Sequence, residues 1–142
     1  MAGALEGIKI LDLTSVGFGP YACQILGDYG AEVIKIESPE GDITRGIAPF
    51  RNKGMGHFFI NANRNKKSLV LDLKSKKGKA AFFKLLEKSD IVMTSIRPAA
   101  MERLGIGFTA CKEINPLLIY VALVGFGQSG PYAKRPAYDD II

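Results

Sequence analysis

Short apolar runs and amphipathic stretches alternate along the chain. Residues 8–13 (IKILDL) and 32–37 (EVIKIE) are rich in isoleucine, leucine and valine, which favours strands. Between them, the turn at residues 14–20 leads into a helix that we expect to end at Gly30, a residue suited to the left-handed position after a helix. Because parallel strands need a crossover, this strand, helix and strand with short joins predict a βαβ unit.

The second half of the chain continues the alternation. The pattern predicts strands at 68–73, 90–94 and 117–124, a helix at 75–88, a short helix that opens at Pro98 and another capped by Thr109. Residues 38–67 instead carry many Gly, Pro, Asn and Arg residues and predict a long excursion from the sheet, which is a common place for function. Together these elements predict a parallel α/β sheet.

Composition indicates one domain suited to an anionic small molecule. The 142 residues carry a net charge of +5 from 19 basic and 14 acidic residues, too small an excess to predict nucleic-acid binding. Cys23 and Cys111 fit neither a metal-ligand spacing nor a disulfide framework, so we expect no metal and a reducing, cytoplasmic setting. The longest apolar run, 117–124, is much too short to span a bilayer, so we expect no membrane partner.

The first turn carries a nucleotide-binding pattern. Residues 17–22 (GFGPYA) match G-x-G-x-x-G/A, and Glu37 lies at the end of the second predicted strand. In dinucleotide-binding folds the glycines let the backbone approach a pyrophosphate, and the acid binds the ribose hydroxyls. One interpretation is therefore an NAD-type nucleotide-binding module. The other is a tight turn that only packs helix on strand, and the pattern leaves both open.

Basic residues gather in two places. Seven of them flank the third predicted strand: Arg64, Lys66, Lys67, Lys74, Lys76, Lys77 and Lys79. Arg97 and Arg103 follow the fourth predicted strand, at the sheet edge where ligands bind in open α/β folds. Both groups suit a phosphate or carboxylate, and a solvated lysine face or ordinary salt bridges are the alternatives.

Taken in order, many segments resemble the N-terminal part of the class III CoA-transferases. They include residues 5–14 (LEGIKILDLT), 30–37 (GAEVIKIE), 41–46 (GDITRG), 63–68 (NRNKKS), 71–74 (LDLK), 97–98 (RP), 103–105 (RLG), 115–116 (NP) and 125–132 (GFGQSGPY). The match covers essentially the whole chain and is far more specific than any single motif. This family includes formyl-CoA and carnitine CoA-transferases and the α-methylacyl-CoA racemases.

The resemblance implies a fold and an activity. The fold is α/β, a Rossmann-like, mostly parallel sheet with helices on both faces, and residues 1–142 would be the N-terminal CoA-binding part of an incomplete large domain. The intact enzyme would be an interlocked homodimer that moves CoA between an acyl-CoA and a small carboxylic acid through an aspartyl anhydride. Coenzyme A or acyl-CoA would be a substrate, and no cofactor would be permanently bound. The compartment would be cytoplasmic, or mitochondrial or peroxisomal in a eukaryote.

The resemblance also assigns binding residues by position. At the thioester end these are Val16, Gly17 and Phe18. Beside the adenosine they are Leu71, Asp72, Leu73 and Lys74, and around the pantetheine and phosphates they are Ile96, Arg97 and Arg103. The segment from Arg135 to Tyr138 would close over the ligand.

Two positions depart from the family pattern. Ser38 stands where several members carry a nucleotide-binding arginine, so Lys35 or the following loop would have to supply that contact. Tyr138 stands where the racemases carry their catalytic histidine. Because a phenol is a poor base near neutral pH, the sequence favours acyl transfer over racemisation, which remains the alternative beside the NAD-type module.

The catalytic residue itself is expected outside this chain. In the family the nucleophile is an aspartate located beyond the segment where this chain stops, so we expect an inactive fragment with no catalytic residue of its own. Tyr138 and Asp139 are accessory candidates because they lie in the substrate loop that the resemblance implies.

Overall fold

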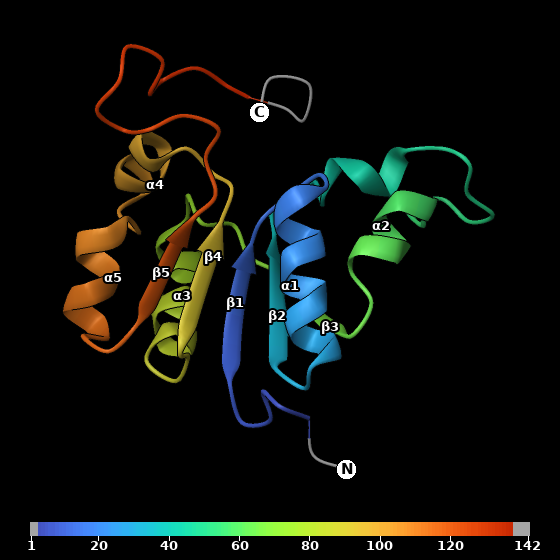
Figure 1. Cartoon of the computed structure of the whole chain (residues 1–142), viewed down its shortest axis with the longest axis horizontal. Helices are drawn as coiled ribbons and strands as arrows, with labels where there is room; N and C mark the ends of the chain where they lie inside the picture. Colours follow the sequence, from blue (N-terminus) through green and yellow to red (C-terminus); the bar gives the residue numbers. More distant parts are fainter. Residues whose placement is uncertain (1–2, 138–142) are drawn as a thin grey trace.

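Five strands form one sheet in the computed structural model, which describes residues 3–137 (Figure 1). They are β1 (Lys9–Leu13), β2 (Glu32–Glu37), β3 (Lys66–Val70), β4 (Ile91–Thr94) and β5 (Ile119–Ala122). Their order in space is β3-β2-β1-β4-β5, and every neighbouring pair is parallel. The parallel α/β fold is therefore confirmed, with the switch point of the topology between β1 and β4.

Helices cover both faces of the sheet. They are α1 (Phe18–Asp28), α2 (His57–Ala62), α3 (Lys76–Leu86), α4 (Pro98–Leu104) and α5 (Phe108–Ile114), with a 3₁₀ turn η1 (Ile43–Gly46). Figure 1 shows α1 over one face, and α3 and α5 over the other. As expected, Gly30 follows α1 with a positive φ of 103°, a conformation that glycine adopts without strain.

The third strand differs from its prediction. Its pairing with β2 runs from Val33 opposite Lys66 to Glu37 opposite Val70, so β3 ends where β2 ends. Leu71 and Leu73 therefore lie outside the sheet. Both are half-buried against the core, and the Leu71 N–H still donates to the Glu37 carbonyl at the end of β2, which is why the apolar pattern continues past the strand.

The cap of α5 also differs from its prediction. Gly107 precedes this helix and accepts a hydrogen bond at its carbonyl from the Cys111 N–H at 3.0 Å, whereas Thr109 lies within the helix. A side chain at Gly107 would meet the Glu102 carboxylate, because an added Cβ would lie 2.0 Å from Glu102 Oε1. Because this oxygen ends a flexible, exposed side chain, Glu102 could move aside, and the contact does not by itself require glycine.

Two apolar clusters, one on each face of the sheet, make up the core. On the α1 face, Ile10, Val33 and Met93 pack with Cys23 and Ala31. The larger cluster on the opposite face contains Leu11, Leu13, Ile36, Val92, Phe82, Leu86, Met101, Ile106, Cys111 and Leu118. Since successive side chains of a strand point to opposite faces, a parallel sheet covered on both sides needs the nearly continuous apolar runs seen in the sequence.

The excursion between β2 and β3 is ordered by buried ion pairs. Lys35 Nζ lies 2.9 Å from Asp42 Oδ2, and both side chains are almost fully buried. Arg45 donates two hydrogen bonds of 2.7 Å to the Glu37 carboxylate, and its guanidinium stacks 3.7 Å from the ring centre of Phe59 in α2. These contacts tie η1 and α2 to the carboxyl end of β2.

Candidate functional site

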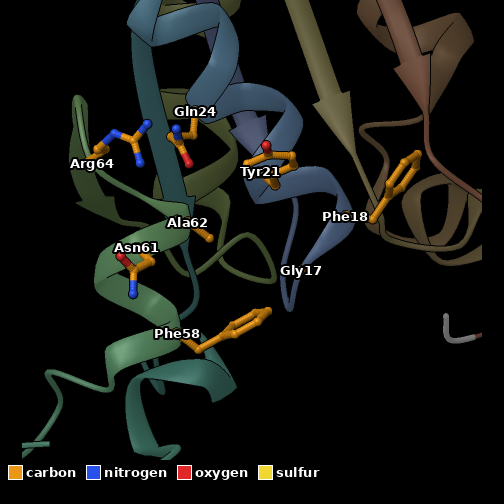
Figure 2. Close-up of a pocket in the computed structure, with 8 residues that line it drawn as sticks. All are labelled: Gly17, Phe18, Tyr21, Gln24, Phe58, Asn61, Ala62 and Arg64. Atoms are coloured by element: carbon orange, nitrogen blue, oxygen red, sulfur yellow. The ribbon is translucent and has the colours of Figure 1, made fainter.

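Two cavities open near the carboxyl edge of the sheet, where open α/β folds bind their ligands. The strand-end pocket, about 360 Å³, is lined by Leu13, Ile36, Glu37, Ser38, Pro39, Glu40, Leu71, Asp72, Leu73, Lys74, Ile96 and Leu104. The helix pocket, about 450 Å³, is lined by Gly17, Phe18, Tyr21, Gln24, Phe58, Asn61, Ala62 and Arg64 (Figure 2). Both volumes suit a small ligand or part of a larger one.

The strand-end pocket gathers residues from the ends of four strands. Residues 71–74 enter it directly after β3, and Ile96 enters it after β4, so five of the positions assigned from the sequence line one cavity. The Leu71 N–H donates to the Glu37 carbonyl at 2.9 Å, which holds this segment against the end of β2. Leu104 and residues 38–40 also line the pocket, and their contribution depends on packing that no motif records.

Asp72 organises the segment between β3 and α3. Its carboxylate accepts a hydrogen bond from the Lys74 N–H at 3.0 Å, and its carbonyl accepts one from the Ser75 hydroxyl at 2.8 Å. Ser75 in turn caps α3 by accepting from the Gly78 N–H. The Lys74 side chain remains exposed at the rim of the strand-end pocket, where a cation can meet an anionic ligand.

The helix pocket lies between α1 and α2. In Figure 2, Phe58 of α2 points toward Gly17, whereas Phe18 points away from α2. A Cβ added at Gly17 would lie 3.2 Å from the Phe58 ring, so the glycine allows close approach. The sequence identified Gly17 and Phe18, and it included Tyr21 of α1 only in the turn motif. Phe58 and Asn61 were missed because α2 was read only as part of a loop.

The turn before α1 joins the two pockets. Leu13 lines the strand-end pocket and Gly17 lines the helix pocket, so residues 14–16 connect them. Val16 in this turn has a φ of 68°, in the left-handed region that β-branched residues rarely adopt. The predicted thioester-end residues are thus adjacent to both cavities.

The remaining predicted site residues lie away from the pocket linings. Arg97 is exposed and its Nη1 donates to the Lys134 carbonyl at 3.4 Å, while the Arg135 guanidinium lies 4.5 Å from the ring centre of Tyr132. Arg103 is exposed on the last turn of α4. The accessory candidates Tyr138 and Asp139 lie outside the described residues.

The structure corrects the interpretation of Glu37 as a free ribose ligand. Its carboxylate accepts hydrogen bonds from Arg45, from Ser68 Oγ at 2.7 Å and from the Asp42 N–H at 3.0 Å. Burial raises the pKa of Glu37, but these hydrogen bonds and the Arg45 charge outweigh it and lower the pKa to about 2. Glu37 is therefore an ionised structural group in the described fold.

The basic cluster around β3 also divides into structural and free members. Lys66 is buried and bonded to Asp12 at 2.8 Å, Lys67 pairs with Glu32, and Arg64 pairs with Asp28. Lys35, which was considered as a substitute for the missing nucleotide-binding arginine, is 2% exposed and paired with Asp42. The buried pairs remove Lys66 and Lys35 from the phosphate-site interpretation, which leaves Arg64 at the helix pocket, Lys74 at the strand-end pocket and the exposed lysines in the first turn of α3.

Other chemistry is limited within residues 3–137. Burial raises the pKa of Cys23 to about 12 and that of Cys111 to about 11, so neither thiol is a reactive nucleophile in the folded chain. No group of three or more His, Cys, Asp or Glu side chains in this part of the chain could hold a metal ion. Over the same residues, no helix combines the length and the apolar character needed to cross a membrane.

The fold and pockets define a Rossmann-like domain with ligand space at the switch point of its sheet. The family model for CoA-transferase family III matches residues 5–142, and the chain belongs to this family. An acyl-CoA transferase of Fusarium pseudograminearum is 43% identical over 98% of this chain and 32% of its own length. An acetyl-CoA:oxalate CoA-transferase of Acetobacter aceti is also 43% identical, over 99% of this chain and 36% of its own.

A solved structure agrees with the sequence comparison. The crystal structure of a CAIB/BAIF family protein from Brucella suis superposes with a TM-score of 0.94 at 36% identity, covering 99% of this chain and 38% of that protein. The chain thus spans about a third of the length of the relatives that it matches.

Proposed function

We propose that this chain forms the CoA-binding part of an enzyme that moves CoA between an acyl-CoA and a small carboxylic acid. The observation that carries the proposal is the strand-end pocket, which brings residues 71–74 and Ile96 together at the carboxyl edge of the sheet. Membership of CoA-transferase family III supports the reaction class. The use of an acyl-CoA donor and a carboxylic acid acceptor by the whole protein is part of this proposal.

The ligand would extend from one pocket to the other. The half-buried side chains of Leu71 and Leu73 offer an apolar wall for the adenine ring of CoA. Lys74 offers a cation for the phosphates of CoA. Arg97, which precedes α4, and Arg103 on α4 are exposed and available to the diphosphate or pantetheine arm. The thioester would then lie beside Val16, and the acyl group or acid acceptor would lie in the helix pocket.

The covalent step would use a carboxylate from a longer polypeptide. An aspartate outside residues 1–142 would attack the thioester carbonyl carbon and release CoA thiolate, which leaves a mixed anhydride. Splitting the exchange in this way replaces one difficult step by easier acyl transfers. Turnover by residues 1–142 alone would contradict this assignment.

We also propose the interlocked homodimer for the intact protein. Helix α1 carries apolar residues on two sides: Cys23 and Leu26 face the sheet, while Phe18 and Tyr21, and Tyr29 just after the helix, are each more than half exposed. A helix that is apolar all round is typical of a buried position. The buried free thiols of Cys23 and Cys111 fit the cytoplasmic setting that we propose.

Calorimetric titration of the chain with CoA, acetyl-CoA and NAD tests the function. We expect CoA and acetyl-CoA to bind and NAD to bind much more weakly, because Glu37 is occupied by Arg45. Lys74→Ala and Arg103→Ala should each weaken CoA binding by about 1.5–3 kcal/mol, the range for a hydrogen bond to a charged group.

Lys67→Ala is the matched control, because Lys67 is an exposed lysine that pairs with Glu32 and lines neither pocket. It should leave CoA affinity unchanged. Added salt should weaken CoA binding to the unmodified chain, since the attraction is between opposite charges. Tight NAD binding with none for CoA would refute the proposal in favour of the NAD-type module.

A further inference from the structure

The turn between the two pockets contains a backbone conformation that must be held in place. Val16 has a φ of 68°, and a β-branched side chain in the left-handed region is strained. Such a conformation persists only where surrounding contacts determine it, and it is frequently found at functional sites. The contacts that hold this turn therefore bear on the site.

Thr14, two residues before Val16, is anchored on three sides. Asp12 Oδ1 accepts hydrogen bonds from both the N–H and the hydroxyl of Thr14. The side chain of Thr14 packs tightly on α1, because a Cβ added at Gly19 would lie 2.5 Å from Thr14 Cβ. The Thr14 carbonyl accepts a hydrogen bond from Lys35 Nζ at 2.9 Å.

Lys35 is an unusual group to find at this position. It projects from β2, is 2% exposed, and places its ammonium 2.9 Å from Asp42 Oδ2 and 5.9 Å from the ring centre of Phe59. A buried ion pair is often no more stabilising than apolar residues of the same volume, so stability alone does not account for it. Its third contact, with the Thr14 carbonyl, is the one that reaches the pocket-joining turn.

Asp42 keeps the lysine in place from the other side. Its second oxygen, Oδ1, accepts from the N–H and the hydroxyl of Thr44, and its N–H donates to Glu37. The carboxylate is therefore fixed before it meets Lys35. Residues 41–46, which the sequence singled out only as a family motif, thus act on the turn through one buried ammonium.

We propose that Lys35 is a positioning residue that holds the Thr14 carbonyl and so keeps Val16 left-handed, with residues 15–17 presented between the two pockets. This role rests on the proposed function, because it concerns the end of the ligand that carries the thioester. Lys35 is too buried to touch a ligand in the described pockets, and it acts only through the backbone that it holds.

The test uses a double variant, Lys35→Met/Asp42→Asn, because removing one partner alone would leave a buried charge uncompensated. The asparagine retains an oxygen for Thr44. Two probes are titrated: acetyl-CoA, which would reach the turn if it binds as proposed, and adenosine 3′,5′-bisphosphate, which would not. We expect acetyl-CoA to bind about tenfold more weakly and the bisphosphate to bind within about twofold of the unmodified chain.

Two further measurements separate positioning from general loss of structure. Hydrogen exchange of the amides of residues 15–17 should accelerate in the double variant while exchange in β1 and β4 stays slow. Adding Val16→Gly to the double variant should recover part of the acetyl-CoA affinity, because glycine adopts a positive φ without strain. Glu32→Gln/Lys67→Met removes an exposed ion pair between β2 and β3, away from the turn, and should change neither affinity.

Each outcome decides whether Lys35 positions the turn. Equal weakening of both probes, or no weakening of either, would overturn the positioning role. The same holds if Val16→Gly gives no recovery in the double variant. If the unmodified chain bound no acetyl-CoA, the proposed function would fail and the positioning role with it. Normal binding by the unmodified chain with an unaffected variant would instead overturn the positioning role alone.

Discussion

At the scale of single residues, the carboxylate of Glu37 links stability to pH. Burial raises its pKa, but hydrogen bonds from Arg45, Ser68 and Asp42 lower it from an ordinary value of 4.5 to about 2. A depressed folded-state pKa stabilises the fold above the unfolded value and loses that contribution as pH falls toward the folded value. The contribution is therefore fully present above pH 4.5 and disappears as the pH falls to about 2.

We predict that Glu37→Gln lowers the free energy of unfolding at pH 7 by about 3 kcal/mol, the energy of this pKa difference. The difference from the unmodified chain should shrink between pH 4.5 and about 2, the range set by the two pKa values. Urea denaturation at several pH values measures it. A stability difference that stays constant down to pH 2.5 would show that Glu37 is not the titrating group.

At the scale of elements, the start of α3 fixes the segment that lines the strand-end pocket. The Ser75 hydroxyl accepts from the Gly78 N–H at 3.0 Å and donates to the Asp72 carbonyl. Gly78 lies so close to this segment that an added Cβ would be 2.0 Å from the Asp72 carbonyl oxygen. The helix start and residues 71–74 therefore form one unit.

We predict that Ser75→Ala costs about 1 kcal/mol of stability, the usual cost of a lost helix cap. Gly78→Ala should cost more, because its methyl group would collide with backbone rather than with a flexible side chain. Thermal and urea unfolding of both variants would measure this order. Ala80→Gly, in the same helix but away from the cap, is the control for helix propensity, with an expected loss of up to about 1 kcal/mol. Gly78→Ala as stable as the unmodified chain would contradict the close packing.

At the scale of the whole molecule, the outer face of α1 exposes several large apolar side chains. Phe18, Tyr21, Ile25 and Tyr29 recur at helical spacing along it, with exposed fractions from 36% to 65%. Contiguous apolar surface of this kind promotes association. The α1 face of the sheet is also only partly covered, because Ile119 of β5, on the same face as Ile10 and Ile91, is 57% exposed.

We predict that the chain self-associates as its concentration rises and that Ile25→Gln/Tyr29→Gln weakens this association by at least severalfold. Sedimentation at increasing protein concentration would measure it. Leu117→Gln is the matched control, because Leu117 is a 91% exposed apolar residue away from α1. A monomer at every concentration, or an equal effect of Leu117→Gln, would contradict the role of the α1 surface.

Features that depend on neighbours in the chain could be predicted before the fold was known. The strand at 32–37 was predicted with its exact ends, and the end of α1 at Gly30 was predicted from the need for a positive φ. Five of the predicted binding positions meet in the strand-end pocket because each directly follows a strand end, and parallel strands place those ends at one edge. Periodicity and capping are local, so a sequence can report them.

Which polar residues are already engaged depends on packing that the sequence does not record. Glu37, Lys35 and Lys66 each looked available to a ligand, yet each is buried with a partner that is distant in sequence or lies in the excursion. The helix pocket likewise depends on α2 packing beside α1, and Phe58 carries no local signal of that contact. Burial and pairing are set by the packing of segments far apart in the chain, because a side chain's partner depends on where the backbone returns rather than on its own neighbours.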